Sequence, residues 1–374
     1  MVNKKRLINT IKKLISIDSQ NPGSNESKIA GFVGRYLKSL GVRVNSYEFS
    51  PKRENIIGIW EGANKRKSLL LTPHLDTVPA GKSWNRDPFT AEIIGDKIYG
   101  LGATDCKGNL AAGLEAINSI IEDGIKLDYN LVFAATADEE NGSSLGLIPL
   151  IEKKILKADV ALVLDADDFE IVITQKGLMH LKVKISGKKA HGAYPWLGVN
   201  AIDIAAKIIV ELKKAGKTQI KNKYLKKPTV NVGTIRGGDK VNVVSDWCEF
   251  ELDFRFLPGS SEKELLHFLK KTISKYTKNF RIEIQGVQDP YYIDPSHPLV
   301  SSLVQAMKQL KIKPRVSGSE GATVITFFKK EGIPAIATGF GFEGCAHIAN
   351  EYASLDNLYK GSQVLVEFLK GYKF

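Results

Sequence analysis

Six acidic and imidazole side chains lie where apolar stretches of this sequence end. They are His74, Asp105, Glu139, Glu140, Asp165 and His347. Two imidazoles and three carboxylates form a mixed nitrogen and oxygen ligand set that suits a pair of zinc-like ions. The remaining carboxylate is free to act as a general base in metal-assisted hydrolysis. The residue types therefore predict a dinuclear hydrolytic site.

The motifs that carry these residues resemble the M20 family of metallopeptidases and amidohydrolases over nearly the whole chain. The motifs are HLDT, GATDCKGN, TADEENG, VALVLD and CAHIANEY. The resemblance implies that His74 and Asp165 bind one metal ion, Glu140 and His347 bind the other, and Asp105 binds both. Zinc is expected, with cobalt and manganese as alternatives.

The motifs around His74 and Glu140 also hold two predicted catalytic carboxylates. A ligating histidine commonly donates its second ring N–H to a carboxylate, and Asp76, two residues after His74, is expected to accept it. Glu139 and Glu140 are adjacent, so their side chains diverge. The resemblance makes Glu139 the base that passes a proton from water to the leaving amine. Burial and the neighbouring charge are expected to raise the pKa of Glu139.

The residues around Asp105 allow other interpretations. Taken alone, Asp105 would indicate the cap of the helix predicted to begin at Lys107. In the family, the peptide bond that follows this aspartate is often cis. Cys106 and Cys345 lie beside the metal motifs, and small buried residues are favoured over thiolate ligands. Three cysteines without a C-x-x-C pair predict no disulfide framework.

The predicted insert contributes further candidate site residues. The resemblance implies that His191 reaches the active site of a partner subunit and helps to hold the oxyanion, so a homodimer through the insert is expected. Asn242 and Arg255 match positions that contact the substrate. Arg255 could hold a carboxylate bidentately, and pairing with Asp253 is an equally open alternative.

Two positions depart from the family pattern. Leu101 stands where the family often has arginine. Ser319-Glu320-Gly321 replaces a core of serine or threonine, aspartate, and glycine or alanine in a loop that shapes the substrate pocket. These departures concern the identity of the substrate and do not touch the predicted metal ligands.

The apolar pattern predicts an α/β fold. Nearly continuous apolar strands at 68–73, 131–137 and 159–165 alternate with helices at 27–40 and 107–124. This pattern indicates a mixed central sheet flanked by helices on both faces, which the resemblance makes zinc exopeptidase-like. Ligands of such sheets collect beyond the carboxyl ends of the strands, where most of the candidate ligands lie.

After Asp165 the pattern changes to the βαββαβ order of a ferredoxin-like arrangement. Its predicted strands are 178–187, 228–235, 247–256 and 280–287, and its helices are 198–216 and 261–276. The predicted organisation is a catalytic metal-binding domain at 1–174 and 288–374, interrupted by a lid or dimerisation domain at 175–287.

The net charge of +12 lies entirely in this insert. Residues 175–287 hold 22 Lys and Arg against 10 Asp and Glu, and the rest of the chain is balanced. A solvated basic face is favoured, steering of anionic substrates comes second, and nucleic-acid binding is not expected. The basic N-terminal segment has helical rather than continuous apolar spacing, and no run reaches the ~20 residues of a membrane helix. Cytoplasmic residence and no membrane partner are expected.

The sequence therefore predicts a dinuclear metal-dependent hydrolase that cleaves an amide bond next to a free carboxylate. The favoured class is an N-acyl-amino-acid deacylase of the acetylornithine or succinyl-diaminopimelate type. A metallocarboxypeptidase or dipeptidase of the same family is the alternative, so the substrate is a small N-acylated amino acid or a short peptide. A non-catalytic binding protein that uses the basic insert is disfavoured, because every metal ligand and the base are present.

Overall fold

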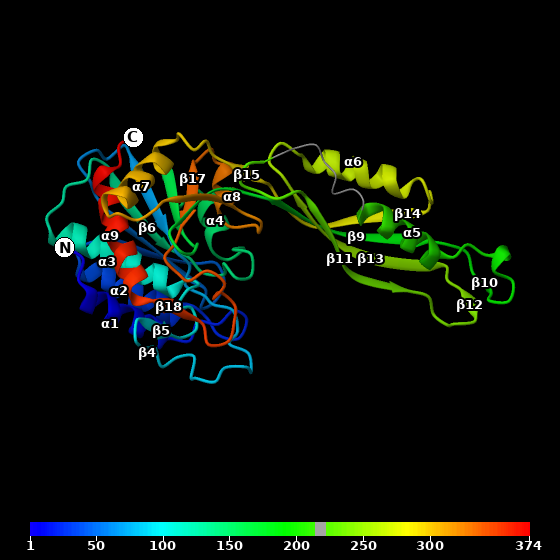
Figure 1. Cartoon of the computed structure of the whole chain (residues 1–374), viewed down its shortest axis with the longest axis horizontal. Coiled ribbons are helices and arrows are strands. Elements are labelled where there is room, and N and C mark those ends of the chain that lie inside the picture. Colours follow the sequence, from blue (N-terminus) through cyan, green and yellow to red (C-terminus); the bar gives the residue numbers. More distant parts are fainter. Residues whose placement is uncertain (214–221) are drawn as a thin grey trace. The chain divides into compact units, whose positions relative to one another are not determined.

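The structure is a computed structural model that describes residues 1–213 and 222–374. The chain forms two compact units, and the second is inserted into the sequence of the first (Figure 1). The first unit comprises Met1–Ile173, Ile293–Ser317 and Phe327–Phe374, and the second comprises Thr174–Tyr292 and Gly318–Thr326. The loop at 318–326, which we expected in the catalytic part, thus belongs to the second unit.

A mixed central sheet forms the base of the first unit. Its strands run in the order β1 (Arg43–Glu48), β2 (Glu54–Trp60), β6 (Asn130–Ala135), β3 (Ser68–Thr72), β7 (Val160–Leu164), β17 (Ala335–Thr338), β8 (Glu170–Gln175) and β15 (Tyr291–Tyr292), and β16 (Arg315–Ser319) pairs with β8. Strand β15 and the last residues of β8 and β16 fall within the residue ranges of the second unit. Strands β6, β3, β7 and β17 are mutually parallel, whereas the remaining pairs along this order are antiparallel. Every residue of β7 is buried, as a strand covered on both faces requires.

Helices flank this sheet. They are α1 (Lys4–Ile15), α2 (Ser27–Ser39), α3 (Lys107–Glu122), α4 (Leu147–Glu152), α7 (Pro298–Gln309), α8 (Ile325–Lys329) and α9 (Leu355–Gly371). Helix α3 packs against α1, α9 and β7, and α2 packs on β1 and β2. A Cβ atom at Gly113 of α3 would lie 2.9 Å from the side chain of Leu164, so glycine lets this helix approach the sheet closely. The predicted α/β fold with a mixed central sheet is confirmed.

A small sheet connects two distant parts of the first unit. Strand β5 (Lys97–Tyr99) pairs with both β4 (Glu92–Ile94) and β18 (Tyr352–Ser354). This pairing brings the segment before Asp105 next to the segment after His347.

The second unit has the predicted βαββαβ order. Its elements are β9 (Gly177–Ser186), α5 (Ala201–Lys213), β11 (Thr229–Gly237), β13 (Trp247–Phe256), α6 (Glu262–Ile273) and β14 (Phe280–Gln288). The antiparallel sheet has the order β11-β13-β9-β14. Alternate residues of β9 and β13 are buried, which gives the sheet one face for packing against α5 and α6.

Other short elements of the second unit are β10 (Ala190–His191), β12 (Val243–Val244) and the 3-10 helix η1 (Pro195–Leu197). The last residues of the predicted helix at 198–216 lie outside the described part of the chain. Within that described part, no helix combines the length and the apolar character needed to cross a membrane.

Candidate active site

Three parallel strands that neighbour one another end beside the candidate ligands. His74 follows β3, Glu139 and Glu140 follow β6, and Asp165 comes directly after β7. A bridge between His74 and Thr136 continues the β3–β6 pairing beyond the strand ends. Because the carboxyl ends of parallel strands meet at one edge of a sheet, these side chains converge.

The structure brings the five predicted ligands together in two groups that share Asp105. The groups are His74, Asp105 and Asp165, and Asp105, Glu140 and His347, and within each group the candidate ligand atoms lie within 4.8 Å of one another. Asp105 Oδ1 lies 2.9 Å from His74 Nε2, and Asp105 Oδ2 lies 3.1 Å from His347 Nε2. One carboxylate thus presents a different oxygen to each group.

Two loops deliver the ligands that do not follow β3, β6 or β7. Asp105 precedes α3, and its peptide bond to Cys106 is cis. His347 lies in the loop between β17 and β18, where its φ is +60°. Its side chain is half-exposed, whereas that of Glu140 is buried, so the second group opens toward solvent.

Buried negative charge is concentrated in this site. Burial, followed by the charge of Asp105, raises the pKa of Asp165 to about 7. Burial and then the charge of Asp165 raise the pKa of Glu139 well above its usual range. Burial opposes ionisation of Asp105, but hydrogen bonds with His347 and His74 hold its pKa well below its usual range. Divalent cations would balance this charge, and the imidazole and carboxylate donors are of the type that zinc, cobalt or manganese accept.

Asp76 supports the turn that carries the two glutamates. Its side chain is completely buried and accepts the backbone N–H groups of Glu139 at 3.0 Å and of Glu140 at 3.2 Å. The acceptor nearest to His74 Nδ1 is the backbone carbonyl of Asp76 at 3.0 Å, and the carboxylate oxygen lies 3.5 Å away. The carboxylate that we expected to orient the imidazole therefore mainly orients the glutamate turn.

A network behind Asp76 was missed by sequence reasoning. The amide of Asn21 donates to Asp76 Oδ2 at 2.9 Å and to Asp138 Oδ1 at 3.1 Å. Arg53 donates to Asn21 Oδ1 at 3.0 Å and pairs with Glu26 at 2.6 Å. Asn21 precedes a proline in a polar segment, which indicates only a loop.

Glu351 was also missed. It is 2% exposed and accepts the backbone N–H groups of Gly102, Thr104 and Asp105 at 2.8–2.9 Å. Burial raises the pKa of Glu351 to about 7, and the three donors act in the opposite direction. Its position four residues after His347, within the last metal motif, was the available signal.

The cysteines lie outside both ligand groups, within residues 1–213 and 222–374. Cys106 is completely buried, its Sγ lies 3.4 Å from the carbonyl oxygen of Leu164, and burial raises the pKa of its thiol to about 12. Cys345 is also buried, and burial raises its pKa. These properties describe small neutral core side chains.

The remaining predicted site residues lie in the second unit. His191 on β10 is opposite Val243 on β12, and the N–H of Gly192 donates to the carbonyl of Asn242 at 2.8 Å, so His191 and Asn242 lie in one hairpin-like tip. Arg255 pairs bidentately with Asp253 at 2.7 and 3.0 Å. This contact is the alternative that the sequence left open for Arg255.

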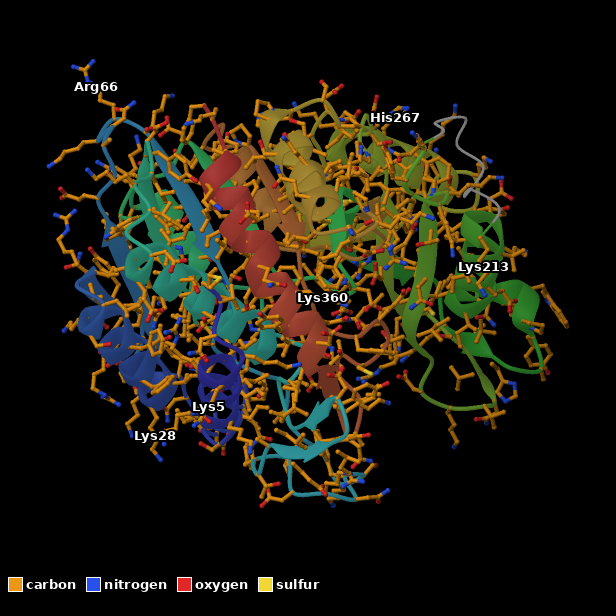
Figure 2. All side chains as sticks on the ribbon, turned by 60° about the vertical axis from the view of Figure 1, so that its left-hand side comes forward. Lys5, Lys28, Arg66, Lys213, His267 and Lys360 are labelled. Atoms are coloured by element: carbon orange, nitrogen blue, oxygen red, sulfur yellow. The ribbon has the colours of Figure 1, made fainter. Side chains whose placement is uncertain are left out.

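The other histidines have contacts or positions that explain them without a ligand. His297 Nδ1 accepts the N–H of Leu299 at 3.2 Å at the start of α7. His180 lies 3.5 Å from a carboxylate oxygen of Asp253. His267 is exposed on the surface of α6 (Figure 2).

The two departures from the family pattern have defined places. Leu101 is 2% exposed in the segment before Asp105. Glu320 forms an ion pair with the ammonium of Lys176 at 2.6 Å and accepts a hydrogen bond from the backbone N–H of Lys226 at 2.7 Å. Its carboxylate therefore connects three segments of the second unit.

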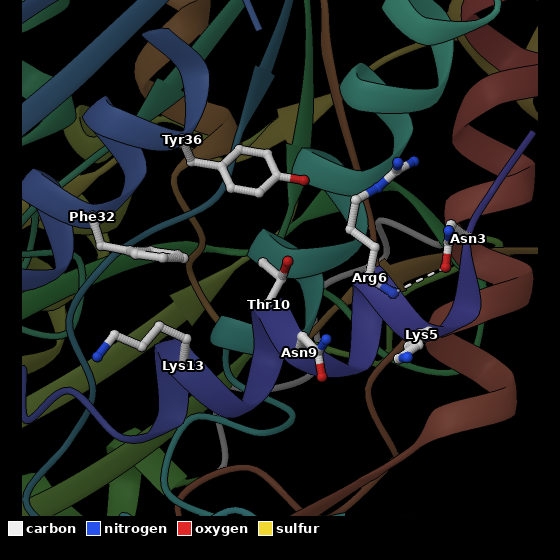
Figure 3. Close-up of a pocket in the computed structure, with 8 residues that line it drawn as sticks. All are labelled: Asn3, Lys5, Arg6, Asn9, Thr10, Lys13, Phe32 and Tyr36. Atoms are coloured by element: carbon white, nitrogen blue, oxygen red, sulfur yellow. Dashed lines mark hydrogen bonds between the residues drawn. The ribbon is translucent and has the colours of Figure 1, made fainter. Parts of the chain in front are cut away.

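A hollow of about 410 Å³ lies between α1 and α2 (Figure 3). Phe32 and Tyr36 line it from α2, and Arg6 lines it from α1. The guanidinium of Arg6 is bound by Glu115 at 2.7 Å and by Glu122 at 2.9 Å. The hollow contains none of the ligand groups, and the guanidinium of Arg6 is already paired.

Comparisons with known proteins show the family of this chain. Residues 70–371 match the model of peptidase family M20/M25/M40. A succinyl-diaminopimelate desuccinylase of Orientia tsutsugamushi (strain Ikeda) is 29% identical over 371 residues, which cover 96% of this chain and 94% of that protein. An acetylornithine deacetylase of Edwardsiella ictaluri (strain 93-146) is 31% identical over 360 residues, which cover 92% of this chain and 91% of that protein.

A solved structure agrees as well. The M20 family metallo-carboxypeptidase Sso-CP2 from Sulfolobus solfataricus superposes with a TM-score of 0.79 at 25% identity, covering 98% of this chain and 99% of that one. The family match spans most of the chain, and these similar proteins extend over its whole fold. The chain therefore belongs to peptidase family M20/M25/M40 and is a metal-dependent hydrolase.

Proposed function

We propose that this chain is an N-acyl-amino-acid deacylase, which cuts the amide bond of a small N-acylated amino acid next to its free carboxylate. The observation that carries the proposal is the pair of ligand groups that share Asp105, with the buried carboxyl of Glu139 close to the charges of Asp165 and Asp105. The similarity to a desuccinylase and a deacetylase supports the substrate class.

In this proposal the chain holds two divalent ions. His74 and Asp165 hold one ion, Glu140 and His347 hold the other, and Asp105 holds both. Zinc is proposed, with cobalt and manganese as alternatives for the same donors. When bound, such ions polarise a carbonyl and lower the pKa of water, which activates both partners in amide hydrolysis.

Glu139 is the proposed general base and acid. Burial and the charge of Asp165 raise the pKa of Glu139, and a carboxyl with a raised pKa can both accept and return a proton. Glu139 takes a proton from the attacking water as the new C–O bond forms. It gives this proton to the nitrogen as the C–N bond breaks, so the amine leaves neutral. Asp76 keeps the glutamate in place through the backbone N–H of Glu139.

Arg255 and Asn242 are the proposed substrate contacts, and Arg255 is the one proposed to bind the substrate carboxylate. Asp253 uses Nε and one N–H of Nη2 of Arg255, which leaves Nη1 for another acceptor. The contact with Asp253 would then orient the guanidinium while Arg255 binds the substrate.

We further propose that two copies pair through the second unit. Tyr194, Trp196 and Val241 are exposed at the tip formed by β10, η1 and β12, and Trp196 is 73% exposed. Exposed apolar groups that gather in one place often mark an interface. The ring of His191 lies 5.8 Å from that of Tyr194, so this interface would include the histidine proposed to stabilise the oxyanion in the partner's site.

A metallocarboxypeptidase or dipeptidase is the second candidate. The likeness to a metallo-carboxypeptidase favours it, and the proposed ions and base would serve that reaction without change. The two candidates differ in the group on the carbonyl side of the scissile amide bond, which is a simple acyl group for the deacylase and an amino acid or peptide for the peptidase.

Metal content and turnover test the proposal together. Elemental analysis should find about two divalent ions per chain. A panel of N-acetyl-ornithine, N-succinyl-diaminopimelate, N-acetyl-methionine and two dipeptides selects between the candidates, because turnover of the dipeptides alone would replace the deacylase with the peptidase.

Variants assign the base. Glu139→Gln keeps the shape of the side chain and should lower kcat by about 10²–10⁴-fold with unchanged metal content. Glu152→Gln, a change at an exposed acid on α4, is the matched control and should behave as wild type. A chain that binds no metal, or a Glu139→Gln variant with full activity, would refute the proposed mechanism.

A further inference from the structure

The reaction proposed above gives no role to Glu351, a buried carboxylate between His347 and β18. Its two oxygens accept three backbone N–H groups from one short segment. Glu351 Oε1 accepts those of Thr104 at 2.8 Å and Asp105 at 2.9 Å, and Oε2 accepts that of Gly102 at 2.8 Å. Three bonds from one side chain to Gly102, Thr104 and Asp105 define the course of that segment.

The segment needs an acceptor of this type. Ala103 and Thr104 are at most 1% exposed, so water cannot serve the N–H groups here, and a buried donor without an acceptor is costly. Gly102 has a φ of +84°, and a Cβ atom there would lie 2.8 Å from Thr77. The turn that directs three N–H groups at one carboxylate therefore depends on glycine at this position.

Further bonds join the same two segments. The backbone N–H of Gly100 donates to the carbonyl of Glu351 at 3.0 Å. The hydroxyl of Thr104 donates to the carbonyl of Tyr352 at 2.7 Å and accepts the N–H of Phe342 at 3.1 Å. The residues before Asp105 are thus held by both flanks of the loop that carries His347.

We propose that Glu351 is a positioning residue that sets Asp105 so that its two oxygens face the two ligand groups. The inference rests on the proposed function, because it treats Asp105 as a shared metal ligand. Glu351 touches neither the substrate nor a ligand atom, and it acts through the backbone N–H of Asp105. Because both groups share Asp105, loss of Glu351 weakens metal binding at both.

Two variants of different severity test this role. Glu351→Ala removes all three acceptors. Glu351→Gln keeps one oxygen, which can still accept the N–H groups of Thr104 and Asp105, and places an NH₂ group against the N–H of Gly102. Glu343→Gln is the control. Glu343 is 67% exposed in the same loop, and its side chain forms an ion pair with Arg315 on the surface.

Cobalt titration of the full chain, stripped of metal, measures the effect by calorimetry and by visible absorption of the cobalt-loaded protein. We expect Glu351→Ala to bind cobalt about 10–100-fold more weakly, with an altered absorption spectrum. Glu351→Gln should recover most of the affinity, because it retains the bond to Asp105, and Glu343→Gln should match wild type. Circular dichroism identifies any variant that fails to fold, and the isosteric Glu351→Gln still carries the test in that case.

The outcomes separate this role from the proposed function. If wild type binds cobalt and a folded Glu351→Ala variant binds it with the same affinity and spectrum, the positioning role is overturned and the proposed function stays intact. A Glu351→Gln variant as impaired as Glu351→Ala would also overturn it, because the bond to Asp105 would then not matter. Wild type that binds no cobalt would overturn the metal centre and, with it, this inference.

Discussion

Replacement of Asp76 by asparagine tests whether the buried carboxylate behind the glutamate turn supports catalysis. Asp76 Oδ1 accepts the N–H of Glu139, and Oδ2 accepts the N–H of Glu140 and the amide of Asn21. Although burial opposes ionisation, the nearby imidazole of His74 and these donors keep the pKa of Asp76 below its usual value. The side chain is therefore a charged acceptor with three donors.

An asparagine fits the same space but can replace only one of the two oxygens. With its oxygen in place of Oδ2, the bonds from Glu140 and Asn21 remain, and the N–H of Glu139 faces an NH₂ group. The opposite orientation loses two bonds, so the first is favoured. A buried N–H without an acceptor costs about 1–3 kcal/mol. We therefore expect the free energy of unfolding to fall by about 2 kcal/mol and the Tm by about 4–8 °C.

The variant should also lose activity, because the lost bond belongs to Glu139 itself. Loss of such a supporting contact typically reduces activity by about 10–100-fold. Scanning calorimetry gives the Tm, and steady-state kinetics on the best substrate of the panel gives kcat.

Asp159→Asn is the matched control, because Asp159 accepts the N–H of Ser68 at 2.8 Å and lies before β7, at the end opposite the site. It should lower the Tm and leave kcat unchanged. An Asp76→Asn variant with wild-type kcat, or a control with an equal loss of kcat, would refute the reasoning.

Three further predictions concern the core, pH and metal. Phe133→Ala removes an almost completely buried side chain of β6 and should cost about 3–5 kcal/mol of unfolding free energy in urea titration. The neutral Nδ1 of His297 accepts the N–H of Leu299 at the start of α7, and burial lowers the pKa of this imidazole. The cap therefore stabilises the fold above the unfolded pKa of about 6.5, and its contribution is lost as the pH falls through the lower folded pKa. Relative to His297→Asn, wild type should lose about 1 kcal/mol of unfolding free energy in acid. Removal of metal by a chelator should lower the Tm, and added zinc should restore it, because a ligand that binds only the folded state stabilises it.

The elements that the sequence predicted well are those whose own residues meet the core. Strands β3, β6 and β7 are buried on both faces and therefore appear as nearly uninterrupted apolar runs. The βαββαβ order of the second unit was predictable because its strands alternate buried and exposed residues and its helices carry apolar faces.

Other elements exist because of distant partners. Strand β1 has no buried residue, so its sequence carries no apolar pattern, and its pairing with β2 defines it. Strands β4, β5 and β18 are three residues each, too short for a periodic signal, and they form because they pair with one another.

The same distinction applies within the site. The candidate ligands were predictable because few residue types bind divalent ions and because their positions after apolar strands place them at one edge of the sheet. Glu351 could not be predicted in this way, since its partners are backbone N–H groups, which leave no trace in the residue types of the partner segment. Asn21 could not be predicted either, because the carboxylates of Asp76 and Asp138 that accept its amide lie far away in the sequence. Arg255 shows the limit, because the sequence allowed a substrate carboxylate or Asp253, and only the geometry identifies the contact with Asp253. A sequence thus predicts which atoms can do chemistry, and the backbone decides which side chains hold those atoms in place.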